Sequence, residues 1–309
     1  MRIFLTGATG YVGAAVLDAL VRGGHDVTAL VRNNEKARDV AARGGHPVIG
    51  SLADLESFRG GAEAQDGYIH AAFDSTAGGG PAVEVPVLEM LIAAAKRPRT
   101  AGATSPARRF IIYTSGVWVL GKAPEPVAED APINPIPHVA FRPAHEKLVL
   151  DAASDRLRTM VVRPGVLYGG GNGLIGDIFK AASNGLVRVI GDGNNHWPLV
   201  YDRDLGDLYA RLAASPDATG VFHANDEGDE RVNDIVSAIK PYLPVKPDVR
   251  YVPIEEARHK MGAYADALAL DRWSAARAHV RWDGRRRCIR SLATPHACSK
   301  SGARPGTRP

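Results

Sequence analysis

The feature that most constrains this chain is a glycine-spaced loop at residues 6–13, with the sequence TGATGYVG. A short apolar run before the loop predicts a strand, and apolar residues at helical spacing after it predict a helix. Gly7 permits a tight turn, Gly10 lets the backbone approach a bound group, and Gly13 lets the helix pack closely on the strand. The start of such a helix offers free N–H groups to phosphate. The loop therefore predicts a dinucleotide site that holds a nicotinamide cofactor.

Beyond this loop, apolar strands alternate with helices through much of the chain. The expected strands cover residues 3–5, 27–31, 47–50, 68–72, 109–114, 159–163 and 220–224. The expected helices cover residues 11–22, 82–97, 139–153, 202–214 and 232–243. Continuous apolar strands that alternate with helices are typical of a parallel sheet covered on both faces. The predicted fold class is α/β, a Rossmann-type doubly wound parallel sheet with a small carboxyl-terminal substrate lobe.

The pattern of the sequence divides the chain into three parts. Residues 1–170 are expected to form the Rossmann domain, and residues 171–270 the substrate lobe, with elements that return to the Rossmann core. Residues 171–200 look rich in loops. Residues 271–309 contain ten basic and two acidic residues and lose apolar periodicity. This tail has three interpretations: a basic segment that meets an anionic partner, a disordered tail, or a late change of reading frame.

Composition excludes several classes of protein. The two cysteines, Cys288 and Cys298, both lie in the tail and imply no disulfide framework. No apolar run approaches the roughly 20 residues that cross a bilayer, and we do not expect the first residues to form a signal peptide. We expect a soluble cytoplasmic protein that acts on a small molecule, with no membrane or nucleic-acid partner and no metal. A homodimer is compatible with this expectation.

The end of the second expected strand bears on the choice of cofactor. A carboxylate there would bind the adenosine ribose and repel a 2′-phosphate, but this chain has Arg32. Arginine binds phosphate through two parallel hydrogen bonds. We therefore expect NADP, with NAD as the alternative; the competing interpretation is that Arg32 lies on a solvated loop.

Four motifs in order resemble the extended short-chain dehydrogenase/reductase family, which includes the NAD-dependent epimerase/dehydratases. They are the glycine loop, His70-Ala71-Ala72, Tyr113-Thr114-Ser115-Gly116 and the segment RPGVLYG at residues 163–169. The likeness covers residues 1–245 and implies a Rossmann fold with a carboxyl-terminal lobe. The cofactor residues expected from the loop, the second strand and the resemblance are Gly7, Thr9, Gly10, Tyr11, Val12, Gly13, Arg32, Leu52, His70, Ala71, Ala72, Lys147 and Pro164.

The chain departs from this family in its acid–base residues. The family uses a Ser and a Tyr-x-x-x-Lys motif, in which the Tyr transfers a proton and the Lys holds the nicotinamide ribose. Lys147 looks like that lysine, but Pro143 occupies the position of the Tyr, and Gly116 that of the Ser, with Ser115 beside it. Ser51 replaces the acid that usually follows the third strand. The chain thus resembles the atypical members that lack the Tyr.

Other side chains are candidates for proton transfer. Lys147, Ser115 and Tyr168 are the expected catalytic residues. Further candidates with an ionisable ring are His138, His145, His196 and Tyr201. Each of them is also compatible with a structural role.

Two pairs of charged residues have competing interpretations. Arg142 and Glu146, four apart on one expected helix, form either a surface ion pair or a substrate anchor. Asp202 and Asp204 suggest a helix cap rather than a metal site, because no His or Cys accompanies them at ligand spacing.

Two functions remain open at this point. The first is an NAD(P)-dependent oxidoreductase, or an epimerase/dehydratase relative, that acts on a small carbonyl or sugar-like substrate. The second is a non-catalytic NADP-binding redox sensor or scaffold, which the missing Tyr favours.

Overall fold

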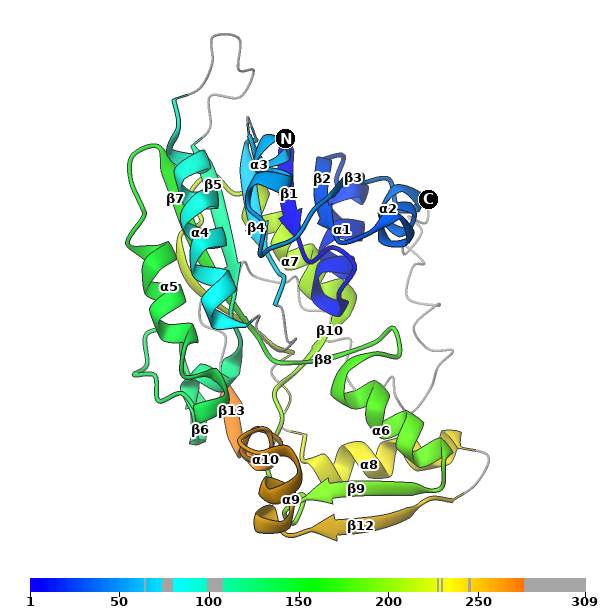
Figure 1. Ribbon diagram of the computed structural model, residues 1–309. Helices are drawn as coiled ribbons and strands as arrows, with labels where there is room; N and C mark the ends of the chain where they lie inside the picture. The colour runs from blue at the N-terminus through cyan, green and yellow to red at the C-terminus, as the bar shows by residue number, and fades with distance from the viewer. Residues whose placement is uncertain are drawn as a thin grey trace, which may run out of the picture.

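A seven-stranded parallel sheet forms the centre of the molecule (Figure 1). The computed structural model describes residues 1–63, 65–73, 80–98, 108–226, 228, 230–243 and 246–274. The strands of the sheet are β1 (Arg2–Thr6), β2 (Asp26–Val31), β3 (His46–Ile49), β4 (Gly67–His70), β5 (Arg109–Thr114), β7 (Leu157–Pro164) and β11 (Gly220–Ala224). Their order is β11-β7-β5-β4-β1-β2-β3. This order confirms the predicted doubly wound sheet, because the chain leaves β1 toward one edge and then returns to build the other from β4.

Helices cover both faces of this sheet. One face carries α1 (Tyr11–Arg22), α2 (Asn34–Ala42) and α7 (Asp202–Ala214), and the other carries α3 (Glu56–Ala62), α4 (Pro81–Lys96) and α5 (Arg142–Leu150). Both layers are apolar on the side that faces the strands, which explains why β4, β5 and β7 are buried along nearly their whole length, without alternation between buried and exposed residues.

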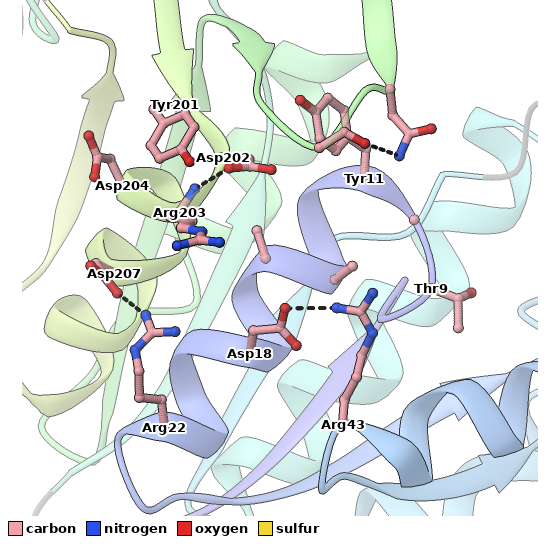
Figure 2. Close-up of a pocket in the computed structure, with 15 residues that line it drawn as sticks. Thr9, Tyr11, Asp18, Arg22, Arg43, Tyr201, Asp202, Arg203, Asp204 and Asp207 are labelled. Atoms are coloured by element: carbon pink, nitrogen blue, oxygen red, sulfur yellow. Dashed lines mark hydrogen bonds and ion pairs between the residues drawn. The ribbon is translucent and has the colours of Figure 1, made fainter. Parts of the chain in front are cut away.

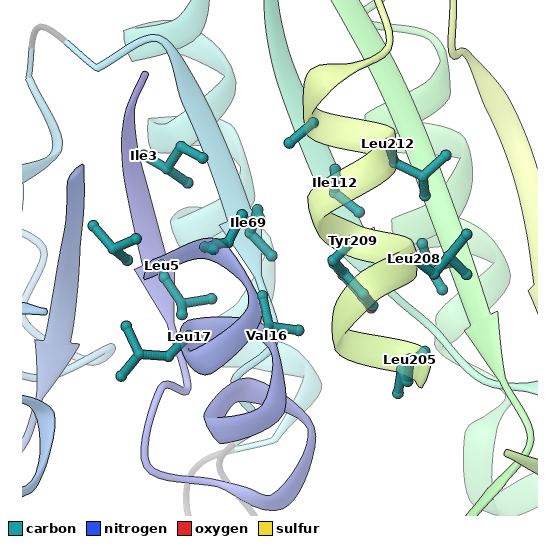
Figure 3. Close-up of a cluster of buried hydrophobic side chains, with 14 of the residues drawn as sticks. Ile3, Leu5, Val16, Leu17, Ile69, Ile112, Leu205, Leu208, Tyr209 and Leu212 are labelled. Carbon is teal, nitrogen blue, oxygen red and sulfur yellow. The ribbon is translucent and has the colours of Figure 1, made fainter. Parts of the chain in front are cut away.

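Helix α7 belongs to the helical layer that covers one face of the sheet, although it follows lobe segments in the chain. Figure 3 shows Leu205, Leu208 and Leu212 of α7 in the same buried cluster as Val16 and Leu17 of α1. Each such side chain contributes about 1.5–3 kcal/mol when fully buried. The two helices approach closely at a glycine: a Cβ on Gly206 would lie 2.3 Å from the carbonyl oxygen of Ala15. The apolar stripe and this glycine together return α7 to the core.

The segment that we expected to be rich in loops contains regular structure instead. Residues 171–200 form α6 (Gly173–Ser183), β9 (Leu186–Ile190) and β10 (Leu199–Tyr201). The glycines near residues 170 and 192 are the turns that flank these elements, and they hid the short apolar runs between them. These elements pack with β8 (Val166–Tyr168) and α8 (Val232–Ile239), and β9 pairs with β12 (Asp248–Val252).

The last described elements connect the lobe to the first part of the chain. They are α9 (Ile254–Met261), α10 (Tyr264–Ala269) and β13 (Arg272–Ser274), and β13 pairs with β6 (Ala123–Val127). Three short 3-10 helices complete the description: η1 (Val117–Leu120), η2 (Pro137–Val139) and η3 (Lys240–Tyr242). From residue 275 onward the basic tail and both cysteines lie outside the described residues. None of the helices in the described part of the chain is long and apolar enough to cross a membrane.

Candidate active site

Steric contacts explain two of the three glycines of the loop between β1 and α1. Gly7 has a φ of +79°, and a Cβ there would meet the carbonyl oxygen of Ala71 at 2.5 Å. A Cβ on Gly13 would lie 2.0 Å from the carbonyl oxygen of Gly7. A Cβ on Gly10 would meet the same oxygen at 3.3 Å, which a shift of a few tenths of an ångström relieves. Packing therefore requires Gly7 and Gly13, whereas a bound pyrophosphate gives the better reason for Gly10.

The start of α1 is suited to an anion. The helix begins at Tyr11, and its N-cap, Gly10, provides no side-chain cap. The first N–H groups of a helix have no intrahelical partner and carry a partial positive charge. This helix start follows β1, beside β4, where the strand order reverses. Doubly wound sheets bind their ligands at this switch point.

A pocket of about 430 Å³ lies at this edge of the sheet, and we call it the inner pocket. Its lining comes from the glycine loop, the end of β4, the segments after β5 and β7, and the segments that begin α5 and α6. The expected cofactor residues among the lining are Tyr11, Val12, Ala71, Ala72 and Pro164. The structure thus brings together four chain segments that the sequence had marked separately.

Ser115 lines the inner pocket with an unused hydroxyl group. Its side chain is buried, and its backbone N–H donates to the carbonyl oxygen of Val162 at 2.8 Å. Its Oγ has no hydrogen-bond partner among the residues that the structure describes. A buried polar atom without a partner costs about 1–3 kcal/mol, so a ligand that bonds to it recovers that energy.

His138, in η2, and Arg142, the first residue of α5, also line the inner pocket. One guanidinium nitrogen of Arg142, Nη1, donates to the carbonyl oxygen of Thr114 at 2.9 Å and to the hydroxyl of Tyr113 at 3.2 Å. The ring of His138 lies edge-on to Trp118, with 5.7 Å between centroids. Partial burial, and then the charge of Arg142, lower the pKa of His138 below its usual value. His138 is therefore mainly neutral near pH 7.

Lys147 lies outside this pocket. Its amino group pairs with Asp151 at 2.7 Å, and its side chain is 75% exposed. Lys147 stands about 140° around the helix from Arg142, because five residues turn an α-helix by roughly 500°. The lysine that the family motif predicted for the cofactor is therefore not among the residues that line the inner pocket.

The suggested ion pair between Arg142 and Glu146 is also wrong. Glu146 instead accepts two hydrogen bonds from Arg163 of β7, at 3.0 and 2.6 Å, and both side chains are buried. Because residues four apart share a helix face, both Arg142 and Glu146 point inward. Each finds its partner on the sheet rather than on its own helix.

Behind Arg142 lies a buried carboxylate, Glu84 of α4, that the sequence analysis did not single out. Its Oε1 is 3.5 Å from Nε2 of His70, and its Oε2 is 3.2 Å from Nδ1 of His145. Although burial alone would raise the pKa of Glu84, the two histidines and Arg142 bring it down to about 2. His145 also lies 3.4 Å from the Tyr113 hydroxyl, which links this cluster to Arg142.

His70 contributes to that cluster rather than to the inner pocket. Its side chain is fully buried, and its Nδ1 is 2.8 Å from the hydroxyl of Thr6. The resemblance implied that His70 lies along the cofactor, but the pocket lining begins one residue later, at Ala71.

The remaining candidates are placed elsewhere. Tyr168 is buried in the lobe, with its ring 5.4 Å from that of Tyr201. His196 pairs with Asp271 at 2.8 Å. Leu52 packs against the core beside α3 and α4. Arg32 is exposed at the end of β2 and makes no ion pair with the described residues.

A larger cavity of about 1180 Å³ lies on the outer side of α1 and α7, and we call it the outer cavity (Figure 2). Thr9, Gly10 and Tyr11 border it, so it shares Tyr11 with the inner pocket. Four carboxylates and three guanidinium groups line the rest: Asp18, Asp202, Asp204, Asp207, Arg22, Arg43 and Arg203. Two of the arginines are already paired, Arg22 with Asp207 and Arg43 with Asp18. Carboxylates repel a cofactor phosphate, so the inner pocket is the better candidate despite its smaller volume.

Neither Asp202 nor Asp204 is the N-cap residue of α7, although Oδ1 of Asp202 accepts a hydrogen bond from the backbone N–H of Arg203 at 2.7 Å in the first turn. The helix begins at Asp202, its N-cap is Tyr201, and no side-chain cap is present there. Both carboxylates lie in the first turn, where the helix dipole stabilises negative charge. The described residues contain no group of ligands that could hold a metal ion.

One signal in the sequence could have found a residue that was missed, since His138 and Arg142 were already among the candidates. Glu84 is an acid in an otherwise apolar helical stretch, which indicates a buried partner. The aromatic lining residues Phe73, Trp118 and Phe141 carried no such signal.

Comparison with known proteins agrees with this fold. The sequence model of the NAD dependent epimerase/dehydratase family matches residues 3–224. An uncharacterized protein of Schizosaccharomyces pombe is 32% identical over 283 residues, covering 88% of this chain and 90% of that protein. The 2-alkyl-3-oxoalkanoate reductase of Stenotrophomonas maltophilia is 27% identical over 325 residues, covering 98% and 93%.

A solved structure shares the fold. The human epimerase family protein SDR39U1, crystallised with NADPH, has a TM-score of 0.67 at 18% identity, covering 87% of this chain and 88% of that chain. The family match spans β1 to β11, the whole of the central sheet. This chain therefore belongs to the NAD-dependent epimerase/dehydratase family, a family of oxidoreductase type with a Rossmann fold.

Proposed function

We propose that this protein is an NAD(P)-dependent oxidoreductase that interconverts a carbonyl compound and its alcohol in the inner pocket. The observation that carries this proposal is the joint lining of that pocket by the glycine loop, Ser115, His138 and Arg142. The name of the Stenotrophomonas relative, a reductase of an oxoalkanoate, supports carbonyl chemistry.

The cofactor site is proposed from the residues that border the switch point. The start of α1 would receive the pyrophosphate, and Ala71, Ala72 and Pro164 would border the nicotinamide half. Arg32, exposed at the end of β2, would bind a 2′-phosphate, so NADP is the proposed cofactor. The NADPH bound to SDR39U1 is consistent with this choice.

A bound nicotinamide supplies or accepts the hydride at the substrate carbon, and a proton must then reach or leave the oxygen. The Ser115 hydroxyl donates a hydrogen bond to that oxygen. In alcohol oxidation the neutral His138 ring takes the hydroxyl proton while the carbonyl forms; in reduction the protonated ring returns it. Lys147 and Tyr168 take no part, because one is paired on the outer face of α5 and the other is buried in the lobe.

The first test compares His138→Gln with Lys147→Met. We expect His138→Gln to lower kcat by about 100- to 10,000-fold, the usual contribution of a proton-transfer group, with unchanged cofactor affinity. Lys147→Met should leave kcat unchanged. The measurements are the absorbance of the reduced nicotinamide with a panel of aldehydes and ketones, and cofactor titration by fluorescence. Full activity of His138→Gln would refute its role. Tight cofactor binding without turnover of any carbonyl would favour a redox sensor or scaffold.

The second test concerns the choice of cofactor. Arg32→Ala should weaken NADPH binding by about 10-fold or more, the loss of a charged hydrogen bond, and should leave NADH binding nearly unchanged. Arg38→Ala, on the neighbouring α2, is the matched control for net charge. Equal effects of Arg32→Ala on the two cofactors would mean that Arg32 lies on a solvated loop.

A further inference from the structure

We infer that the inner pocket binds a carbonyl compound with an apolar body and an acidic group, and that Arg142 is the residue that pairs with the acid. This inference rests on the proposed function and names the substrate class of the same site. Its evidence is the state of Arg142, the character of the surrounding wall and the number of cations in the pocket.

Arg142 is held in place, but no acid among the described residues neutralises it. Its Nη1 is fixed by Thr114 and Tyr113, while its other guanidinium donors make no hydrogen bond with the described residues. No carboxylate of the described residues lies within ion-pair distance of it. Glu84 contacts His145, which lies near the Tyr113 hydroxyl that Arg142 also contacts, so Glu84 and Arg142 are linked only through these two side chains. A half-buried guanidinium with open donors is a ready partner for a carboxylate, because the pair forms two parallel hydrogen bonds.

Two aromatic rings pack against this guanidinium. The rings of Phe73 and Phe141 stack with centroids 5.6 Å apart and planes 10° apart. The central carbon of Arg142 lies 5.6 Å from the first centroid and 5.3 Å from the second. Arginine packs favourably on aromatic faces and is more weakly hydrated than lysine. The rings thus prepare the cation for an anion that approaches from the pocket.

The rest of the wall is mainly apolar. Val117, Trp118, Val139 and Leu174 line the same pocket, from η1, η2 and α6. An apolar wall gains about 25 cal/mol for each Å² that a ligand removes from water, so it favours an alkyl or aryl body. The carbonyl would then meet Ser115 and His138, with its acid on Arg142.

The same lining disfavours a nucleotide sugar. Among the described residues that line the inner pocket, Arg142 is the one lysine or arginine. A nucleotide sugar would bring two phosphates and a nucleobase, which need several cations and donors. The volume of about 430 Å³ is near the lower end of ligand pockets and must also accommodate the nicotinamide.

Equilibrium binding tests the inference without turnover. Phenylacetate and phenylacetamide have the same body, but only the first carries an acid. By calorimetry on protein saturated with NADP, we expect phenylacetate to bind about 10-fold more tightly, the effect of one added charged hydrogen-bonded pair. Arg142→Met should remove that difference, and Lys147→Met should preserve it. Equal binding of acid and amide by the unaltered protein overturns the inference, whatever the protein catalyses.

Turnover separates this inference from the proposed function. The panel is phenylpyruvate and benzoylacetate, their amides, pyruvate as the acid without an apolar body, and UDP-glucose. We expect the highest kcat/KM for one of the two aromatic acids. Arg142→Met should raise the KM for that acid strongly, and it should change kcat for the matching amide much less. Reduction of acids and amides at equal rates, or a preference for UDP-glucose, rejects the substrate class while the oxidoreductase proposal stands.

Discussion

The inner and outer faces of α5 differ in what they contribute, although they carry similar charged residues. The inner face presents Arg142, His145 and Glu146 to the sheet, where each has a partner on another element. The outer face presents Lys147, whose partner Asp151 is on the same helix. Residue spacing in the sequence shows which side chains share a face of α5. Only the rotation of the helix relative to the sheet decides which of its faces borders the pocket, and that face carries Arg142 and not Lys147.

The largest expected difference between the two faces concerns stability. Glu146→Gln leaves Arg163 as an uncompensated buried charge, and we expect it to lower the free energy of unfolding by about 3–5 kcal/mol. Asp151→Asn on the outer face should cost no more than about 1 kcal/mol, because water screens an exposed pair. Urea denaturation measures both. Similar losses for the two variants would contradict the distinction between the faces.

A second difference concerns acid. Glu84, which contacts His145 of the inner face and His70 of β4, has its pKa depressed from 4.5 to about 2 in the folded protein. A depressed pKa contributes stability above the unfolded value, and this stability is lost as the pH falls from about 4.5 to 2. The amount is about 3 kcal/mol. Glu84→Gln should be less stable near pH 7 and should flatten this loss. Urea midpoints measured across that window check it, and parallel curves for the two proteins would contradict it.

The smallest expected difference between variants of the two faces of α5 concerns the pH dependence of the reaction. Because the pKa of His138 lies below its usual 6.5, alcohol oxidation should be constant above about pH 7 and should fall about tenfold per pH unit on the acid side. Arg142→Met removes the nearby positive charge and should shift this limb to higher pH. Lys147→Met should leave it in place. The profile of kcat/KM against pH measures the shift, and an unmoved limb in Arg142→Met would mean that burial alone sets the pKa of His138.

The sequence predicted some parts of the site better than others for a physical reason. The glycine loop was predictable because glycine spacing between a strand and a helix is a local property. Ala71, Ala72 and Ser115 were expected from the family resemblance, and all three line the inner pocket. Lys147 was expected from the same resemblance but does not line that pocket, because its direction depends on the phase of α5, which the contacts of Arg142 and Glu146 with the sheet determine.

By itself, the sequence determined the doubly wound sheet and the position of the dinucleotide loop, since periodicity, apolar strands and glycine spacing are local. The strand predicted at residues 220–224 and the helix predicted at residues 202–214 have the same bounds as β11 and α7. Only the tertiary structure decided that the element that returns to the core is α7, packed on α1, and that residues 171–200 form a helix and strands. It also decided that Glu84 lies between two histidines and that Arg142 rather than Lys147 faces the pocket. These features depend on contacts between residues far apart in the chain, and such contacts leave no periodic pattern in the sequence.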